Sequence, residues 1–577
     1  MAIGKTSSTR MQSNTSDEFS FWLATNARVN PTDIVVTQNP DGSHTYGLVT
    51  RIENISDSES HLDNFVSHDF GSTTATPHTQ RLSTNVARCV VLKNTQNIYM
   101  PVVGGQNVEF ANADGILTAL GIGEVQQANP NFRSLPAGII ELSNGERAPA
   151  TIDARYLLGP EGAHFNITGI SGLAAKTSYA MFLLNVLLQR YSNEVAAIIF
   201  NVKQDDLLYI NQPSVNPLDE RQQELWRVLE VSPQPFQNVT YFIPRGEIGR
   251  RDARQVVSNS YAQTPPQGHL RYSYALKDMS DKLSYLFTHV EDPRETLRAL
   301  LEDIEEDLQA GSIRTSTFTQ LIEHFQQILR PPQAEGQQRR QQRRTYHEHR
   351  HSTIGKFVRL FRYFVQTGTS GLFVDNKADN EVTLAHYIWA IRPGQVYVID
   401  IARLHDFERG FVVGDVVNEV YRLFARDITY GQVPQEIRQR VWQGQEIDPE
   451  SPIEPPSKLV FFVDELNKYA PAGKEISPIL HNLLEITERG RSLGVILLGA
   501  EQFASDVHPR IIGNCSNKIY GRSDSTELGD QAYRHIPQDL KALITRLDQG
   551  TLLLQHPLYR QPVKIRFPRP VYREPHS

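Results

Sequence analysis

Cysteine is scarce in this chain, which has 577 residues and only two cysteines, Cys89 and Cys515. They lie far apart and belong to no Cys-x-x-Cys or Cys/His cluster, so the sequence argues against a disulfide framework and a structural zinc site. The chain has no apolar run of the roughly 18 residues that suggest a membrane span, and its N-terminal stretch lacks the apolar core of a signal peptide. We therefore expect a protein of the reducing cytoplasm that neither crosses a membrane nor is exported.

An overall positive charge is also missing. Lys and Arg together number 58 against 65 Asp and Glu, which gives a formal net charge of -7. Any contact with nucleic acid must therefore come from local patches or from loops that an oligomer brings together. With 39% hydrophobic residues, a chain of this length is expected to hold roughly two to four domains, each with a core of its own.

The first part of the chain has the pattern of short β-strands. Alternating apolar and polar runs are separated by Gly, Asn, Asp and Pro, as in DIVVTQ, TYGLVTRIENI, ARCVVLKN and AGIIELS. Such spacing is typical of an all-β unit. We predict a small β-barrel over residues 19–150, preceded by a flexible N-terminus over residues 1–18.

Strand-like and helical segments then alternate. HFNITGI leads through a glycine-containing turn into KTSYAMFLLNVLLQRY, whose apolar residues have helical spacing, and VAAIIFNV follows as a continuous apolar run. Similar runs return at QVYVIDIARL, KLVFFVDEL, GVILLGAEQ and NKIYGR. Alternation of this kind predicts a parallel, doubly wound sheet. We assign it to residues 151–211 and 379–560, with residues 561–577 as a C-terminal tail.

The intervening segment, residues 212–378, is predicted to be a largely helical insertion. DKLSYLFTHV, PRETLRALLEDIEEDL and FTQLIEHFQQILR each have a one-sided apolar face. The insertion contains a basic loop over residues 331–352, which has too few apolar residues to fold by itself. Two interpretations stay open, a cationic lining for a ring pore and a surface loop without a particular role. The arginines of the loop are Arg339, Arg340, Arg343, Arg344 and Arg350.

Three histidines around this loop suggest a metal site, but no cysteine or suitably spaced acidic partner supports it. These histidines are His347, His349 and His351.

The turn after HFNITGI resembles a phosphate-binding loop with two departures. The usual pattern, G-x-x-x-x-G-K-[ST], has glycine before the lysine, whereas Ala175 precedes Lys176 here and Ile170 stands at the first glycine position. Gly169 and Gly172 still permit a tight turn, and backbone amides make most contacts to phosphates in such loops. By itself, the stretch fits a phosphate cradle and an ordinary lysine near a helix start equally well.

A second motif, KLVFFVDELNKYAP, is an apolar strand that ends in Asp464 and Glu465. An aspartate in this position holds Mg²⁺, and the adjacent glutamate orients and polarises the attacking water. Because the loops of a doubly wound sheet open at the same carboxyl edge, we expect Lys176 and Asp464 to meet. An acidic strand end alone is a common chance match, but its ordered combination with the loop favours a nucleotide site.

Polar residues after the later strands complete the set of candidates. Gln502 ends one strand and is a candidate sensor of the terminal phosphate. Arg489 and Arg491 precede that strand, and Arg522 ends the next, so each can complete a neighbouring subunit's site as an arginine finger. The alternative, exposed arginines in ordinary surface pairs, stays open.

Five blocks in order resemble the HerA family of DNA-translocating ATPases, of the HerA/FtsK branch of RecA-like P-loop proteins. They are NITGISGLAAKTSYAMFLL, FNVKQDDLLY, VYVIDIARL, LVFFVDELNKYAP and ERGRSLGVILLGAEQFASDVHPRIIGNCSNKIYGR. The resemblance implies an α/β RecA-like P-loop core, an N-terminal HAS-type barrel, a homohexameric ring, and ATP-driven movement of double-stranded DNA through its pore. It also implies a nuclease or an NAD-cleaving, sirtuin-like effector docked on the barrel face.

The resemblance assigns roles residue by residue. Thr177 and Asp464 match the Mg²⁺ ligands, Glu465 the residue that activates water, and Gln502 the sensor. Arg489 resembles the arginine finger that acts in a neighbouring subunit, with Arg491 and Arg522 as competitors. The loop has one residue more between its second glycine and the lysine than the family's commoner G-x-x-G-x-G-K-[ST]. ATP is expected to contact Gly169, Gly172, Ala174, Ala175, Lys176, Thr177 and Ser178.

The sequence thus favours a hexameric ATPase that moves along duplex DNA and serves a partner effector in antiviral defence or DNA end processing. The defence role follows from the family resemblance alone. Two alternatives stay open. The first is a nucleotide-binding ring scaffold that assembles and regulates a partner enzyme with little motor activity, which the unusual loop favours. The second is a P-loop ATPase that remodels proteins.

Overall fold

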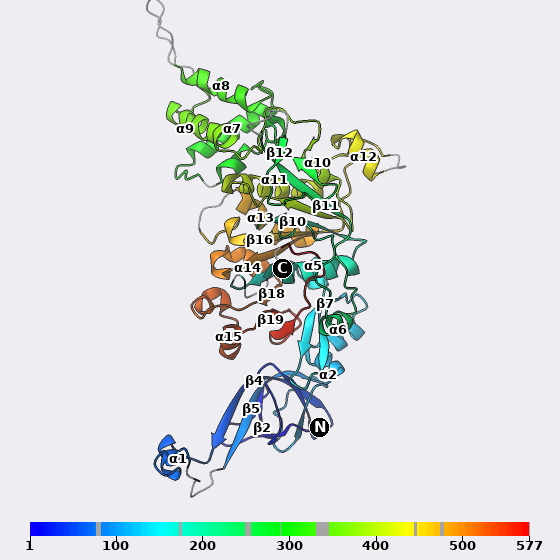
Figure 1. Ribbon diagram of the computed structural model, residues 1–577, viewed down its shortest axis with the longest axis vertical. Helices are drawn as coiled ribbons and strands as arrows, with labels where there is room; N and C mark the ends of the chain where they lie inside the picture. Colours follow the sequence, from blue (N-terminus) through cyan, green and yellow to red (C-terminus); the bar gives the residue numbers. More distant parts are fainter. Residues whose placement is uncertain are drawn as a thin grey trace, which may run out of the picture.

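The computed structural model describes residues 1–577 except 75, 77–81, 171, 173–175, 249–255, 289, 331–344, 443–446, 474–477 and 576–577. The molecule is elongated, with a β-barrel at one end, an α/β core in the middle and a helical lobe at the other end (Figure 1). The fold class expected from the sequence, an α/β P-loop core with an N-terminal all-β barrel and a helical insertion, is confirmed.

The barrel closes in the order β1-β2-β5-β4-β3-β6, and its pairs are antiparallel. Buried Phe19, Phe21 and Val49 fill its interior. The long β4–β5 hairpin extends beyond the barrel and carries helix α1 (His61–Ser67), none of whose residues is buried (Figure 1). The barrel strands are β1 (Gly4–Ser7), β2 (Glu18–Leu23), β3 (Ile34–Gln38), β4 (His44–Ser56), β5 (Ser83–Asn94) and β6 (Asn107–Phe110).

The predicted flexible N-terminus, residues 1–18, is not a tail. Strand β1 pairs with both β2 and β6, so the barrel closes only through these first residues. Gly4 makes the close approach possible, because a Cβ there would lie 2.0 Å from the carbonyl oxygen of Trp22. The short polar segment gave no strand pattern in the sequence, and its strand depends on tertiary pairing.

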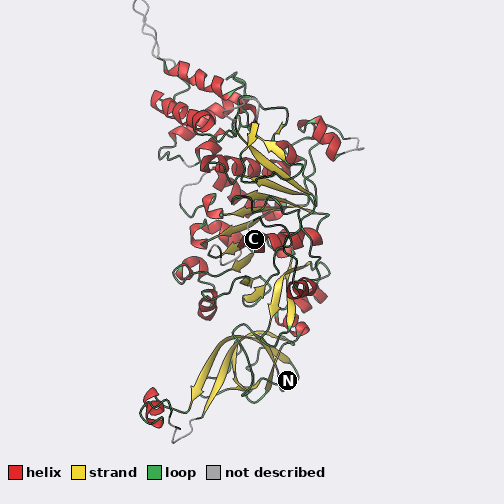
Figure 2. Cartoon of the chain, in the orientation of Figure 1, coloured by secondary structure: helices red, strands yellow, loops and turns green. Residues whose placement is uncertain are grey.

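The core is one large mixed sheet, which Figure 2 shows as a stack of strands between helices. Its strands follow the order β14-β13-β11-β15-β10-β16-β17-β9-β18-β19-β20-β7-β8, and β12 (Val256–Ser258) pairs with β11. From β14 to β18 all neighbours are parallel. The parallel strands are β9 (Phe165–Thr168), β10 (Val195–Asn201), β11 (Val239–Ile248), β13 (Leu270–Tyr272), β14 (Glu381–Val382), β15 (Val396–Asp400), β16 (Lys458–Asp464), β17 (Val495–Glu501) and β18 (Asn517–Tyr520).

Helices cover both faces of the parallel strands, as a doubly wound sheet requires. Along β10, Ala197 and Ile199 belong to one buried cluster, while Ile198 and Phe200 belong to the other. On the first face α5 (Lys176–Arg190) packs on β9, β10 and β17. Residues of α2 (Ala113–Ala119), α3 (Ile122–Ala128), α4 (Arg155–Leu158) and α6 (Glu220–Val228) belong to the same buried cluster. The second is covered by α10 (Leu384–Trp389), α11 (Asp406–Phe424), α13 (Pro478–Leu493), α14 (Pro509–Asn514) and α15 (Gln538–Ile544).

Three predicted boundaries differ from the structure. The barrel does not extend to residue 150, because β7 (Ser134–Glu141) and β8 (Arg147–Asp153) form a hairpin that joins the core sheet. Residues 561–577 are no tail, since β20 (Val563–Arg566) lies between β7 and β19 (Thr551–Gln555). The segment 212–378 is only partly helical, because β11 and β13 continue the parallel sheet. For β7 and β11 pairing with a strand distant in sequence decides the structure, whereas β20 pairs mainly with the nearby β19.

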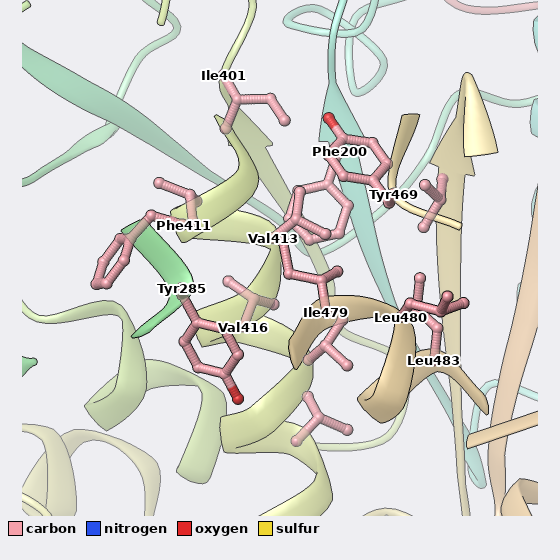
Figure 3. Close-up of a cluster of buried hydrophobic side chains, with 14 of the residues drawn as sticks. Phe200, Tyr285, Ile401, Phe411, Val413, Val416, Tyr469, Ile479, Leu480 and Leu483 are labelled. Atoms are coloured by element: carbon pink, nitrogen blue, oxygen red, sulfur yellow. The ribbon is translucent and has the colours of Figure 1, made fainter. Parts of the chain in front are cut away.

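The helical lobe contains α7 (Thr296–Gln309), α8 (Phe318–Leu329) and α9 (His351–Arg362), with α12 (Gln435–Val441) elsewhere beside the core. DKLSYLFTHV, expected as a helix, forms a short 3₁₀ helix, η2 (Leu283–Phe287), against α11. Figure 3 shows Tyr285 of this helix beside α11 and Ile479 of α13. The hydroxyl of Tyr285 accepts a hydrogen bond from Asn482 Nδ2 at 2.7 Å.

A buried ion pair cluster joins the start of η2 to α11. Lys282 donates to Asp415, and its Nζ lies 2.7 Å from Glu419 Oε1. Tyr274 donates to the second oxygen of Asp415 at 2.6 Å, and Trp389 Nε1 donates to Glu419 Oε2 at 2.8 Å. Both carboxylates are therefore compensated by a charge and further hydrogen bonds, which burial of charge requires.

Two histidines expected beside the basic loop bond to aspartates of α7. His347 Nε2 lies 3.0 Å from Asp307 Oδ2, and His349 Nε2 lies 2.6 Å from Asp303 Oδ2. The basic loop itself, with Arg339, Arg340, Arg343 and Arg344, lies outside the described residues, while Arg350 is exposed at the start of α9.

Across the described part of the chain, none of the helices has both the length and the apolar character that crossing a membrane demands.

Candidate functional site

The loop between β9 and α5 lies at the carboxyl edge of the parallel strands. It leaves the sheet at Gly169, with φ +148°, and passes through Gly172, with φ +81°. Both values lie where glycine is favoured, so these two glycines give the loop its turn. Ile170 N donates to the carbonyl oxygen of Arg522 at 2.8 Å, which ties the loop to the end of β18. Ala174 and Ala175, expected to contact nucleotide, lie outside the described residues.

Lys176 and Thr177 begin helix α5 directly after the loop. Lys176 is buried, and its Nζ donates to the carbonyl oxygen of Gly169 at 2.6 Å. Burial lowers the pKa of Lys176, against the opposing effect of nearby carboxylates led by Asp464. Thr177 Oγ1 donates to Asp464 Oδ2 at 3.1 Å. Ser178 follows within the same first turn and is half-buried. The loop and the acidic strand therefore meet, as their positions at one sheet edge predict.

Asp464 is the last residue of β16 and is almost fully buried. Glu465 follows it in the left-handed conformation, with φ +57° and ψ +47°. A left-handed glutamate is uncommon, and such backbone strain often occurs at functional sites. The turn is stabilised by Glu465 N, which donates to Asp464 Oδ1 at 3.0 Å. It directs Glu465 away from the strand axis at the sheet edge.

A second lysine, Lys203, forms ion pairs with the carboxylates of both Asp464 and Glu465, and the sequence motifs did not point to it. Lys203 follows β10, and its Nζ lies 3.0 Å from Asp464 Oδ2 and 3.1 Å from Glu465 Oε1. Although burial acts to lower the pKa of Lys203, the two carboxylates outweigh it and raise that pKa. In turn, burial acts to raise the pKa of Glu465, but Lys203 outweighs it and the pKa falls below its usual value. Lys203 was detectable from its place just after the carboxyl end of a fully buried strand.

Glu501 is the second residue that the sequence reasoning missed. It ends β17 level with Thr168 of β9, and it is fully buried. Asn166 Nδ2 donates to its Oε1 at 2.7 Å, while its Oε2 has no hydrogen-bond partner among the described residues. Burial raises the pKa of Glu501 to about 8, so this carboxyl is largely protonated at neutral pH. The predicted sensor, Gln502, is the next residue and is half-buried just beyond the strand.

The three candidate arginines occupy two different edges of the sheet. Arg522 is exposed at the carboxyl edge, where its carbonyl oxygen contacts the loop of the same chain. Arg489 and Arg491 are exposed near the end of α13. Gly490 between them packs on the first residue of β17, since a Cβ there would lie 2.3 Å from Val495 O.

That contact places Arg489 and Arg491 at the amino edge of the sheet. The seven residues of β17 separate them from the loop by roughly 20 Å. Within one chain they cannot reach a phosphate held by Lys176. Arg489 Nη1 instead pairs with Glu485 Oε2 at 3.1 Å on the helix surface.

The donor set at the carboxyl edge fits a hard cation and phosphates. A hydroxyl, Thr177, and a carboxylate, Asp464, are the oxygen ligands that Mg²⁺ prefers, and Mg²⁺ takes its remaining ligands from water and phosphate. The described ranges contain no group of three or more His, Cys, Asp or Glu side chains that could enclose a metal. The glycine turn and the start of α5 supply the backbone amides and helix dipole that favour an anion.

Solved structures with similar folds are remote in sequence. VirB4 of Thermoanaerobacter pseudethanolicus gives a TM-score of 0.40 at 14% identity, covering 76% of this chain and 97% of that one. The unbound bacterial conjugative coupling protein TrwBdeltaN70 gives 0.39 at 12%, covering 78% and 94%. The genome packaging NTPase B204 from Sulfolobus turreted icosahedral virus 2, with ATP-gammaS, gives 0.21 at 14%, covering 32% and 71%. The sequence matches no protein-family model and no curated protein.

Proposed function

We propose that this chain is an ATP-hydrolysing motor, with Mg²⁺ as cofactor, that works as a homohexameric ring on double-stranded DNA. The observation that carries the proposal is the contact between Thr177 and Asp464, beside the buried Lys176. It brings a phosphate-binding loop and an acidic strand end together at one sheet edge, and phosphoryl transfer needs both.

Each residue of the site has a distinct role in this proposal. Lys176 and the loop amides hold the phosphates, and Thr177 with Asp464 holds Mg²⁺, which neutralises charge on the phosphate oxygens. Glu465 lies beside Asp464 and accepts the proton of the attacking water. Gln502, beyond the end of the neighbouring β17, senses the terminal phosphate.

Completion of the site requires a neighbouring subunit. Arg489 and Arg491 lie at the sheet edge opposite the loop, so an arginine finger from α13 can act only on another chain's phosphate. A head-to-tail interface that joins the two edges repeats and closes into a ring. Arg522, in contrast, lies beside the loop of its own chain and is proposed to contact the nucleotide there.

The DNA substrate, the hexameric state and the effector rest on the resemblance to the HerA family. A nuclease or a sirtuin-like, NAD-cleaving enzyme docked on the barrel is the proposed partner, in antiviral defence or DNA end processing. The arginines of the basic loop are proposed to line the pore, so their neutralisation should weaken DNA binding and reduce its salt dependence.

The competing function is a ring scaffold that binds nucleotide and regulates a partner enzyme without turnover. It is favoured by the missing glycine before Lys176. ATP hydrolysis with and without duplex DNA, measured for the wild type and for Glu465→Gln, separates the two functions. We expect turnover in the wild type that the variant loses. Absence of turnover with every DNA and partner tested would reject the motor, and stimulation by polypeptide alone would favour a protein-remodelling ATPase.

A further inference from the structure

Two lysines reach the carboxyl edge of the sheet, and their surroundings differ. Lys176 is buried and bonds to the loop backbone through Gly169. The side chain of Lys203 is 43% exposed, and its ion pairs are to the acidic pair, Asp464 and Glu465. Lys176 therefore belongs to the loop, whereas Lys203 belongs to the carboxylates.

Lys203 uses the same carboxylate oxygen as Thr177. The hydroxyl of Thr177 lies 3.1 Å and the ammonium of Lys203 lies 3.0 Å from Asp464 Oδ2. Thr177 and Asp464 are also the residues suited to hold Mg²⁺. The ammonium of Lys203 therefore contacts an oxygen that would bind the metal. A divalent cation beside the same oxygen would meet the positive charge of Lys203 at close range, and the two cations would repel each other.

The turn that carries Lys203 is fixed to the sheet, although the side chain is half-exposed. Asn201 Nδ2 donates to the carbonyl oxygen of Gln204 at 2.7 Å and to Asp400 Oδ1 at 2.9 Å. Asn201 Oδ1 accepts from Leu207 N at 3.2 Å. Asp400 in turn accepts from Ser260 Oγ at 2.5 Å. These bonds hold the backbone of Lys203 in place, so only its side chain can exchange the carboxylates for another partner.

We propose that Lys203 is an internal counter-cation, which neutralises Asp464 and Glu465 in the nucleotide-free site and leaves them when metal and triphosphate bind together. The inference rests on the proposed nucleotide site and deepens it. A metal ion alone must expel the ammonium into solvent with no compensating anion. A metal that arrives with a triphosphate supplies that anion, because the released ammonium meets the phosphate charge.

This exchange makes metal and nucleotide binding cooperative. A ligand that removes a competitor raises the affinity of the second ligand, and the coupling is reciprocal. It also keeps Glu465 neutralised and unsuited to accept a proton until nucleotide is present. Lys203 is therefore a positioning residue, since it acts through the two carboxylates.

The test measures metal binding without nucleotide. Mn²⁺ binding to the full chain is followed by electron paramagnetic resonance of free Mn²⁺, with and without a non-hydrolysable ATP analogue. We expect weak Mn²⁺ binding by the wild type alone and much tighter binding with the analogue. Lys203→Met should tighten binding in the absence of nucleotide by about tenfold or more, and reduce the enhancement by the analogue by the same factor.

Two control variants decide the interpretation. Lys468→Met removes an exposed charge near Glu465 that contributes to the electrostatics of that residue, and it should leave Mn²⁺ binding unchanged. Lys203→Arg keeps the charge and should retain weak binding.

Equal tightening by Lys203→Met and Lys468→Met, or no tightening by Lys203→Met, would overturn the counter-cation role while leaving the nucleotide site intact. If the wild type bound no Mn²⁺ even with the analogue, the proposed nucleotide site and this inference would both be rejected. Circular dichroism confirms folding of each variant.

Discussion

Thr177 Oγ1 donates a 3.1 Å hydrogen bond to Asp464 Oδ2 and so joins two residues that are 287 positions apart. The bond crosses the sheet edge from the first turn of α5 to the end of β16, with β17 between β16 and β9. The pairing depends on the sheet order, which brings two segments that are distant in sequence to one edge. It defines the place where a metal and phosphates can bind together.

Removal of the Thr177 hydroxyl tests that relationship. Thr177→Val deletes a hydrogen bond to a charged group and a candidate metal ligand, while the side chain keeps its volume. We expect Mg²⁺-dependent kcat/KM for ATP to fall roughly 10- to 100-fold, since bonds to charged groups contribute about 1.5–3 kcal/mol. Thr177→Ser retains the hydroxyl and should stay within a few-fold of the wild type. A steady-state ATPase assay at varied Mg²⁺ measures both, and equal losses in the two variants would contradict the role of the hydroxyl.

Glu465→Gln tests proton acceptance beside Asp464. The amide preserves the shape of the side chain but cannot accept the proton, so hydrolysis should fall by about 10²- to 10⁴-fold. ATP affinity, measured by calorimetry, should change little, because Lys176 and the loop supply the phosphate contacts. A variant that hydrolyses ATP at the wild-type rate would remove Glu465 from the chemistry.

Mixing of two inactive variants tests the arginine finger. Lys176→Ala chains lack the phosphate lysine, and Arg489→Ala chains lack the arginine at the opposite edge. If Arg489 acts on the neighbouring site, a mixed ring contains interfaces with an intact loop on one side and an intact arginine on the other. We expect ATPase activity to reappear on mixing, while each variant alone loses about 10³-fold or more.

Arg491→Ala and Arg522→Ala serve as controls in the same mixing assay. Restoration with Arg491→Ala in place of Arg489→Ala would assign the finger to Arg491. Arg522 lies beside the loop of its own chain, so mixing with Lys176→Ala should not restore Arg522→Ala. Restoration of Arg522→Ala would contradict its proposed role within the chain.

The buried carboxyl of Glu501 predicts a pH dependence of stability. Its pKa is raised to about 8 from 4.5, so between these values the folded chain holds a proton that the unfolded chain releases. Its contribution is fully present below about pH 4.5 and is lost as the pH rises through 8, at up to about 1.4 kcal/mol per pH unit. Asn166 and Lys176 oppose the shift, while Asp464 and Glu527 favour it.

Glu501→Gln removes the titration and keeps the shape of the side chain. The Tm of the wild type should therefore fall more steeply between pH 6 and 8 than that of the variant, as measured by differential scanning fluorimetry. Parallel Tm curves for the two chains would show that Glu501 is ionised in the folded protein at neutral pH.

The Lys282 cluster predicts a large loss of stability on substitution. Lys282→Met leaves the carboxylates of Asp415 and Glu419 buried without their lysine, which should cost about 3–5 kcal/mol. Arg298→Met breaks an exposed pair with Glu302, whose side chains are 63% and 61% exposed, and should cost about 0–1 kcal/mol. Urea unfolding followed by tryptophan fluorescence, to which Trp389 beside Glu419 contributes, compares the two variants, and similar midpoints would contradict the argument.

The sequence predicted the core strands well where they are buried on both faces. VAAIIFNV, KLVFFVDEL and GVILLGAEQ are continuous apolar runs and became the central strands β10, β16 and β17. Because parallel strands end at one edge, Lys176 was expected to meet Asp464; the neighbouring Thr177 makes the hydrogen bond to that carboxylate, and Lys176 bonds to Gly169. Strands β1 and β11 were missed, since each pairs with a strand distant in sequence. Strand β20 was also missed, although it pairs with the nearby β19.

The site was predicted less completely than the sheet. The sequence pointed to Gln502, whereas Glu501 is the residue buried at the end of β17. A strand that is buried on both faces shows no alternation of apolar and polar residues, so its sequence does not tell which side chain faces inward. Lys203 was missed because a lysine after a strand has no motif of its own. Whether an arginine acts within its own chain depends on the direction of α13, which only the fold reveals.

Strand β9, which leads into the loop, lies between β17 and β18 and has no partner near it in sequence. During synthesis, its partners emerge only after more than 300 further residues, which takes roughly 15–60 s at 5–20 residues per second. For all of that time β9 lacks both of its native strand partners. Chaperone occupancy of nascent chains should accordingly be high from β9 onward and decline once β17 and β18 have left the ribosome.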